Sequence, residues 1–249
     1  MSSLLTNNSA MNALSTLRNI NDSLATNQDR ISTGLRISSG KDNAAYFSIA
    51  KTMDGDSGMF KSIDEGLTLT QNSVKTARTG AENVQDLAKQ FTERVAFAQG
   101  DAVDRTEVQK ELNELTARIQ TTIDQSTFNG HDLFSGAAAT QTVVTGISRA
   151  GGTFATTSIT FQSVDLQSIQ STLAAIDIST ASTGAVTAAL TTAEGASKAI
   201  KVLDVALSKV SQSRSDLGAV SNRLDSTISN LTNITTNVEA ARSQIADAD

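Results

Sequence analysis

Proline, cysteine and tryptophan are absent from this 249-residue sequence, and aromatic side chains are few. There is one tyrosine, Tyr46, and there are eight phenylalanines, so a buried core must consist largely of Leu, Ile, Val and Ala. Without proline, no stretch is barred from a helix by ring geometry. Without cysteine, disulfide bonds and thiolate metal sites are excluded. The composition favours long, closely packed helices, and the chain is long enough to bury a sizeable core.

Basic clusters and long apolar runs are also missing. The net charge is −6 and the sequence pI is about 4.8, which argues against a nucleic-acid partner, because phosphates are neutralised by clustered Lys and Arg. No stretch approaches 18 apolar residues, so we expect no membrane segment. Residues 1–8 lack a basic start followed by an apolar run, which predicts export, if any, without a cleaved signal peptide.

A heptad repeat occupies the C-terminal quarter of the sequence. One seam position is apolar every time, at Leu203, Val210, Leu217, Leu224, Leu231, Val238 and Ile245. The other seam position also admits Arg214, Ser221, Thr235 and Arg242. A single helix through this stretch would be about 70 Å long at the usual rise per residue. Such a helix is not stable alone in water, so its seam must face partner helices.

A second apolar stripe has the same steps of three and four residues. It comprises Ile63, Leu67, Thr70, Val74, Ala77, Ala81, Val84, Ala88, Phe91, Val95 and Ala98. Gly100-Asp101 interrupts it, and Val108, Leu112, Leu115, Ile119 and Ile123 resume the pattern before the turn signal Phe128-Asn129-Gly130. The pattern predicts a helical hairpin.

The N-terminal stripe is weaker. It consists of Leu14, Leu17, Leu24, Ile31 and Leu35, while Asn21 and Gln28 stand at seam positions. A helix of this length is marginal by itself, so we expect residues 1–43 to be mobile in a monomer and to need apolar surface from a partner.

The middle of the sequence is rich in Thr, Ser, Gly and Ala. Runs at Thr140–Thr145 and Thr157–Phe161 predict two strands of a small hairpin, and Asp165–Ile176 predicts a short helix before a long helix that begins near Thr191. The fold class is therefore mainly α, a long antiparallel coiled-coil-like helical rod with a small β-hairpin-containing insert. Its segments are 1–43, 44–135 (helical hairpin), 136–190 (insert) and 191–249 (long C-terminal helix).

Features typical of catalytic or metal sites have simpler interpretations. His131 is the only histidine and fits a surface loop. Asp54, Asp56, Gly58 and Glu65 fit part of a calcium-loop frame, but Met59 stands where that frame needs Gly, so a connection between helices is the preferred interpretation. Glu107, Glu111 and Glu114 fit a solvated helix face with ion pairs. We expect no enzymatic activity, no metal and no cofactor.

Three stretches resemble bacterial flagellins in sequence, order and separation. They are Arg30–Ile37 with Lys41–Ala45, then Gln125–Gly130, then Arg214–Val220 with Asn222–Leu224. The resemblance covers residues 1–135 and 190–249. It implies a subunit of the bacterial flagellar filament, whose two terminal segments pack together as the filament core, so that Leu14, Leu17, Leu24, Ile31 and Leu35 would serve subunit packing. The rod core would contain Leu67, Val74, Val84, Phe91, Leu112, Leu203, Val210, Leu217, Leu224, Leu231 and Val238.

The resemblance also implies partners and a location. The partners would be further copies of the chain, the flagellar export apparatus and a flagellin chaperone, and hook-associated and cap proteins, in an extracellular flagellum. In some flagellins a helix face is recognised by a host innate-immune receptor. The corresponding face here would carry Lys89, Glu93, Arg94, Glu111, Leu115 and Arg118. Lys89 and Glu93 stand where recognised flagellins offer Arg and Leu, which suggests weak recognition.

Two alternatives stay open, and one departure bears on assembly. A hook–filament junction protein shares flagellin-like termini, and a surface adhesin or carbohydrate-binding protein could use the Thr- and Ser-rich insert, although only Phe154 and Phe161 are there to stack on sugars. Flagellins normally continue beyond a stretch like Ala241–Asp249 into a last helix. Without that helix we expect this chain not to form long filaments by itself.

Overall fold

The computed structural model describes residues 7–100, 103–128, 133–134, 139–149, 153–179 and 193–248. The chain divides into two compact units. The terminal unit comprises the described residues up to Ser62 together with those from Thr232 onward, and the central unit comprises Ile63–Leu231. Each unit therefore contains residues from both halves of the sequence. The segments predicted from the sequence (1–43, 44–135, 136–190 and 191–249) instead follow changes in secondary structure.

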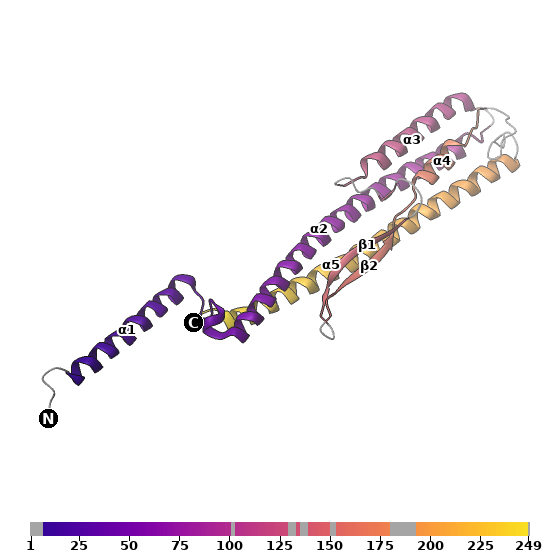
Figure 1. The fold of residues 1–249 in the computed structure, drawn as a ribbon. Helices are drawn as coiled ribbons and strands as arrows, with labels where there is room; N and C mark the ends of the chain where they lie inside the picture. Colours follow the sequence, from indigo (N-terminus) through magenta and orange to yellow (C-terminus); the bar gives the residue numbers. More distant parts are fainter. Residues whose placement is uncertain are drawn as a thin grey trace. The chain divides into compact units, whose positions relative to one another are not determined.

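The helices and strands occur in the order α1 (Asn8–Thr33), α2 (Gly40–Phe97), α3 (Arg105–Gln125), β1 (Thr140–Ser148), β2 (Ala155–Gln162), α4 (Gln167–Ala174) and α5 (Ala193–Ala246) (Figure 1). The mainly helical fold with a small antiparallel sheet confirms the predicted fold class. The long helices reflect the absence of proline, since nothing in α2 or α5 removes a backbone donor.

Short polar side chains and one glycine set the ends of α1 and α3. The Asn7 side chain accepts a hydrogen bond from the Ala10 amide at the start of α1, and Asp104 accepts from Thr106 and Glu107 at the start of α3. Helix α1 ends at Gly34, which has φ 68°, a left-handed conformation that favours glycine.

Helix α2 begins earlier than the sequence pattern predicted. Residues 54–65 were expected to connect two helices, but they lie within α2, so that interpretation is wrong. Gly55 and Gly58 resemble stop signals, yet Ala50, Ser57 and Phe60 beside them are buried in the terminal unit. Tertiary burial of this kind overrides the weak helix propensity of glycine.

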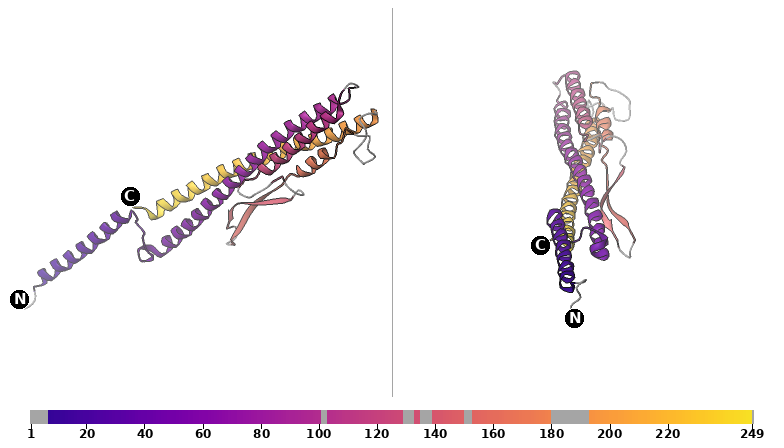
Figure 2. Two further views of the ribbon diagram at one scale, coloured as in Figure 1. Left: turned by 90° about the horizontal axis from the view of Figure 1, so that it is seen from above. Right: turned by 60° about the vertical axis from the view of Figure 1, so that its left-hand side comes forward.

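Within the central unit, α2 and α5 run in opposite directions and α3 folds back beside α2 (Figures 1 and 2). The antiparallel pairing is apparent from contacts of Gln71 with Asp225 and of Glu82 with Arg214. The Arg94 guanidinium and the Glu111 carboxylate, 3.2 Å apart, join α2 to α3. The predicted helical hairpin is thus formed by α2 and α3, and α3 ends at Gln125, three residues before the expected turn.

The middle of the chain forms the predicted hairpin and short helix. Strands β1 and β2 pair antiparallel from Thr140 opposite Gln162 to Ser148 opposite Ala155, with a bulge between Val144 and Gly146. Both strands are longer than predicted. Helix α4 is held on α3 by two reciprocal hydrogen bonds between the Gln120 and Gln167 side-chain amides, at 3.1 and 2.8 Å.

Candidate functional site

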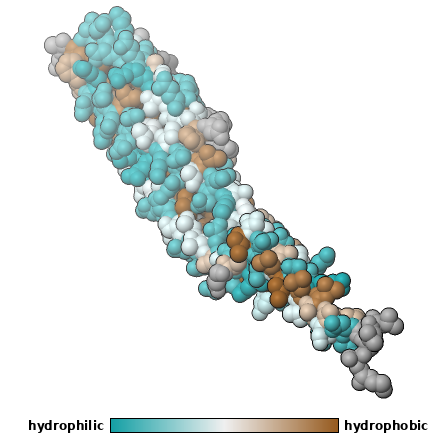
Figure 3. All heavy atoms as spheres, turned by 90° about the vertical axis from the view of Figure 1, so that its left-hand side faces the viewer, coloured by the Kyte–Doolittle hydropathy of each residue, from teal (hydrophilic) through white to brown (hydrophobic). Residues whose placement is uncertain are grey.

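Helix α1 is an amphipathic helix whose apolar face is uncovered. None of its 26 residues is buried, and Leu14, Leu17, Leu24 and Ile31 are 48%, 55%, 54% and 82% exposed. Hydrophobic side chains gather along this helix at the lower right of Figure 3. Contiguous exposed apolar surface of this kind is uncommon unless it meets a partner.

The structure adds one residue to the predicted apolar face and removes another. Ile20 is 57% exposed and lies three residues after Leu17 and four before Leu24, so helical spacing alone could have found it. Leu35 lies beyond the end of α1 and forms an antiparallel bridge with Asp247, because Gly34 turns the chain away from the helix. We therefore define the α1 face as Leu14, Leu17, Ile20, Leu24 and Ile31.

The segment after α1 is fastened to the end of α5. The amides of Arg36 and Ile37 donate to the Ala246 carbonyl at 2.7 and 3.2 Å, and the Ala248 amide donates to the Gly34 carbonyl at 2.9 Å. The Arg36 guanidinium also donates to the carbonyls of Gln244 and Ile245, both at 3.0 Å. A cation on the last carbonyls of a helix offsets their partial negative charge. These bonds join the segment after α1 to the C-terminal end of α5.

A polar turn begins α2. The Asp42 carboxylate accepts hydrogen bonds from the backbone amides of Ser39 and Ser38, at 3.0 and 3.1 Å, and these bonds lower the pKa of Asp42. One residue later Asn43 has φ −163° and ψ 106°, and its side chain accepts from the amides of Ala45 and Tyr46. The helix thus starts a second time after Asn43.

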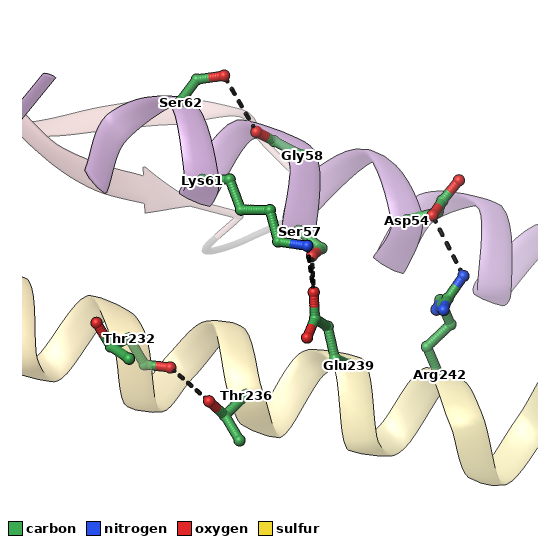
Figure 4. Close-up of polar contacts among 9 residues, drawn as sticks. All are labelled: Asp54, Ser57, Gly58, Lys61, Ser62, Thr232, Thr236, Glu239 and Arg242. Atoms are coloured by element: carbon green, nitrogen blue, oxygen red, sulfur yellow. Dashed lines mark hydrogen bonds and ion pairs between the residues drawn. The ribbon is translucent and has the colours of Figure 1, made fainter. Parts of the chain in front are cut away.

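Charged side chains cross between α2 and α5 in the terminal unit (Figure 4). The Lys61 ammonium lies 2.6 Å from Glu239, and the Ser57 hydroxyl donates to the same carboxylate at 3.1 Å. Lys61 and then Ser57 lower the pKa of Glu239 through these hydrogen bonds. Arg242 and Asp54 form a second pair at 3.4 Å.

Polar pairs also interrupt the apolar seam of the central unit. Arg214 donates to Glu82 at 2.8 Å and to the Gln85 side chain, and Gln71 donates to Asp225. Within the described part of the chain, the Nε of Arg214 has no hydrogen-bond partner. A half-buried guanidinium with one unpaired nitrogen is stable only if its other nitrogens are paired, so the contact with Glu82 stabilises Arg214 at this position.

The side chains expected in the rod core lie mainly in the interior of the central unit. Those that are at most 2% exposed are Leu67, Val74, Val84, Phe91, Leu112, Leu203, Val210, Leu217, Leu224 and Leu231. Val238 belongs to the terminal unit and is only half-buried.

The residues considered for receptor recognition lie on α2 and α3. Lys89, Glu93, Arg94, Glu111 and Arg118 are exposed, whereas Leu115 is 8% exposed and belongs to the core. Glu93 and Arg94 border a groove of about 500 Å³ together with Glu111 and Arg118. Phe97, which is 57% exposed, also lines this groove, so the face combines charged side chains with apolar surface.

The other site-like features bring no ligands together. Asp54, Asp56, Gly58 and Glu65 are helical, so they do not form a calcium-binding loop. In the described ranges no cluster of three or more acidic, His or Cys side chains is placed to hold a metal ion. His131 lies outside the described residues. No helix in the described part is long and apolar enough to cross a bilayer.

Two protein-family models match the sequence. The bacterial flagellin N-terminal helical region matches residues 4–139, more than half of the chain, and the bacterial flagellin C-terminal helical region matches residues 200–249. The first match spans α1, α2 and α3, and the second spans most of α5. The exposed face of α1 and the fastening between Gly34–Ile37 and α5 thus lie within the matched regions.

Individual relatives agree with this match. Flagellin A of Rhizobium meliloti is 40% identical over 155 residues, which are 61% of this chain and 39% of that protein, so the match spans about two fifths of that relative. A flagellin of Brucella melitensis biotype 1 is 29% identical over 250 residues, covering 100% of this chain and 86% of that protein.

Solved structures show the same fold. Bacillus cereus flagellin matches with a TM-score of 0.50 at 22% identity, and the match covers 72% of this chain and 94% of that chain. A candidate flagellar hook-associated protein of Vibrio parahaemolyticus matches with a TM-score of 0.52 at 12% identity, and the match covers 83% of this chain and 98% of that chain. At these identities the likeness concerns the fold alone.

Proposed function

The chain belongs to the bacterial flagellin family, and from this premise we propose that it is a structural subunit of a flagellar filament. It is exported through the flagellar secretion apparatus with the help of a flagellin chaperone, and it assembles outside the cell with further copies of itself next to hook-associated and cap proteins. Its role is mechanical, since a polymer of such subunits transmits rotation for swimming.

The exposed α1 face carries this proposal. Burying an apolar side chain such as Leu17 or Leu24 gains about 1.5–3 kcal/mol, and a helix without buried side chains gains none of this in the monomer. Helices of neighbouring copies supply the missing surface in a polymer. Contacts that do not close into a ring then propagate as a helical filament.

Seeded assembly tests the proposal. Purified chain is mixed with sheared flagellar filaments and sedimented, and the pellet is examined by negative-stain microscopy and mass spectrometry. Because filament seeds supply partner surface that the chain lacks by itself, we expect incorporation of the unmodified chain and at least a tenfold loss for Leu17→Ser/Leu24→Ser. Asn12→Ser/Asp22→Ser, which changes exposed polar residues of the same helix, is the matched control. Equal incorporation of both variants would remove the α1 face from the interface.

The hook–filament junction role is the weaker candidate. Its support is a common fold at 12% identity, whereas the relatives that match over the whole chain are flagellins. A junction protein would occur in few copies per flagellum, and a filament subunit in thousands. Quantitative mass spectrometry of isolated flagella distinguishes these stoichiometries.

We extend the proposal to host recognition, where we expect a weak response. The face formed by Lys89, Glu93, Arg94, Glu111 and Arg118 is charged and exposed, and an apolar contact on it would leave those charges desolvated. In a receptor-reporter cell assay, Lys89→Arg/Glu93→Leu should raise the response to the soluble chain at least fivefold. An unchanged response would show that other residues limit recognition.

A further inference from the structure

The heptad pattern of the α2–α5 seam does not by itself exclude a slip by one heptad. Buried side chains recur every seven residues on both helices of the central unit, at Leu67, Val74, Ala81, Ala88 and Val95 on α2 and at Leu203, Val210, Leu217, Leu224 and Leu231 on α5. Sliding one helix by one heptad, about 10 Å, would again place apolar side chains against apolar side chains. Side-chain volumes along the seam differ, and charges beside it can add to the preference for the observed register.

Charges on α2 differ between positions one heptad apart. In the observed register Arg214 meets Glu82. The positions seven residues before and after Glu82 hold Lys75 and Lys89, which lie on the same helix face. A slip in either direction would therefore exchange an attraction of Arg214 for a repulsion.

The second polar pair of the central unit opposes one of the two slips. Asp225 accepts from Gln71, and the position seven residues before Gln71 holds Asp64. The position seven residues after it holds Arg78, which would attract Asp225. The slip that brings Asp64 opposite Asp225 is thus repulsive at both pairs. The slip that brings Arg78 opposite Asp225 is repulsive only where Arg214 meets Lys89.

The terminal unit has the same alternation of sign, visible in Figure 4. Glu239 meets Lys61, while the position one heptad earlier holds Asp54. Arg242 meets Asp54, while the position one heptad later holds Lys61. Each direction of slip places one like-charged pair together in this unit as well.

We propose that these charges form a register code, in which Arg214, Asp225, Glu239 and Arg242 of α5 face α2 residues whose charge changes between heptads, so that each one-heptad slip loses the observed pairs and places at least one like-charged pair together in each unit. The code adds to the packing of the seam in favouring the observed register. The proposal does not depend on the role in a filament, since it concerns pairing within one chain.

Cysteine cross-linking tests the register directly, because the sequence contains no native cysteine. Thr68 lies two heptads before Glu82 and Ile228 lies two heptads after Arg214, so these two residues face each other when the antiparallel helices are in the observed register. The variant Thr68→Cys/Ile228→Cys therefore reports the observed register. Thr68→Cys/Ser221→Cys reports the slip that brings Lys75 opposite Arg214. Intramolecular disulfide formation in dilute protein is quantified by peptide mass spectrometry after mild oxidation.

Two charge reversals should move the cross-link. Arg214→Glu would be repelled by Glu82 and attracted by Lys75, so the slipped product should rise at least tenfold and the native product should fall. Adding Glu82→Lys should restore the native product. Lys75→Glu leaves the contacts of Arg214 with Glu82 and Gln85 in place and should raise the slipped product at least threefold.

The controls make the outcome decisive. Lys209→Glu changes net charge equally at an exposed position of α5 and should leave both products unchanged. High salt should also raise the slipped product, because it screens exposed charges. If circular dichroism shows that Arg214→Glu is not folded, the cross-linking result for Lys75→Glu decides whether the register code holds. A slipped product that stays at background in Lys75→Glu and in folded Arg214→Glu would overturn the register code.

Discussion

At the scale of single residues, Gly80 is tightly enclosed. A Cβ atom at this position would lie 2.0 Å from the Ser126 hydroxyl oxygen and 2.9 Å from the Phe134 ring. We expect Gly80→Ala to reduce the free energy of unfolding by about 1–3 kcal/mol, as is usual for overpacking. Gly218→Ala is the control: its added methyl meets nothing within 4 Å, and it should be neutral or stabilising by up to about 1 kcal/mol. Equal melting temperatures for the two variants would contradict the close packing at Gly80.

Leu224 tests the seam of α5. Its side chain is fully buried, so Leu224→Ala should lower the free energy of unfolding by about 2–5 kcal/mol. Lys209→Ala, at an exposed position of the same helix, should change stability by less than about 0.5 kcal/mol. Urea denaturation of both variants provides the comparison, and similar midpoints would show that this seam position is not packed as described.

Glu239 makes the terminal unit sensitive to acid. Hydrogen bonds from Lys61 and Ser57 hold its pKa below the ordinary value of 4.5, so its ionised form is favoured by folding. The stabilisation is fully present above pH 4.5 and is lost as the pH falls through the lowered pKa of the folded state. Glu239→Gln should therefore flatten the acid dependence of amide exchange in the last turns of α5, and Glu114→Gln, at an exposed position of α3, should not. Identical pH profiles for Glu239→Gln and the unmodified chain would show that this pair does not hold the helix.

At the scale of elements, α1 and α3 differ in burial although both are long amphipathic helices. Helix α3 buries Val108, Leu112, Leu115, Thr116, Ile119 and Ile123, and α1 buries no side chain. We expect amides of α1 to exchange in seconds in dilute monomer and those of α3 to be strongly protected, because an isolated helix of this length is marginal. Protection of α1 equal to that of α3 would mean that its apolar face is already covered, and incorporation into filaments should raise its protection.

At the scale of the whole molecule, assembly and folding should be separable. The central unit holds most of the buried side chains, and α1 holds none. Removing residues 1–33 should therefore leave the main thermal transition within about 2 °C, while abolishing seeded incorporation. A large loss of melting temperature in the truncated chain would show instead that α1 stabilises the monomer.

Sequence alone determined the helical class, the two strands, α4 and the start of α5, because heptads and β-branched runs are local patterns that a short window contains. It also identified the flagellin resemblance and the apolar face of α1, apart from Ile20. It did not foresee that α2 continues through Gly55 and Gly58, since burial of Ala50, Ser57 and Phe60 within the terminal unit favours helix there. Nor could it place Leu35 beside Asp247 or oppose Glu82 to Arg214. Those pairings join residues far apart in the chain, and a repeating apolar pattern does not specify which residues of two helices face one another, so tertiary contacts decide their register.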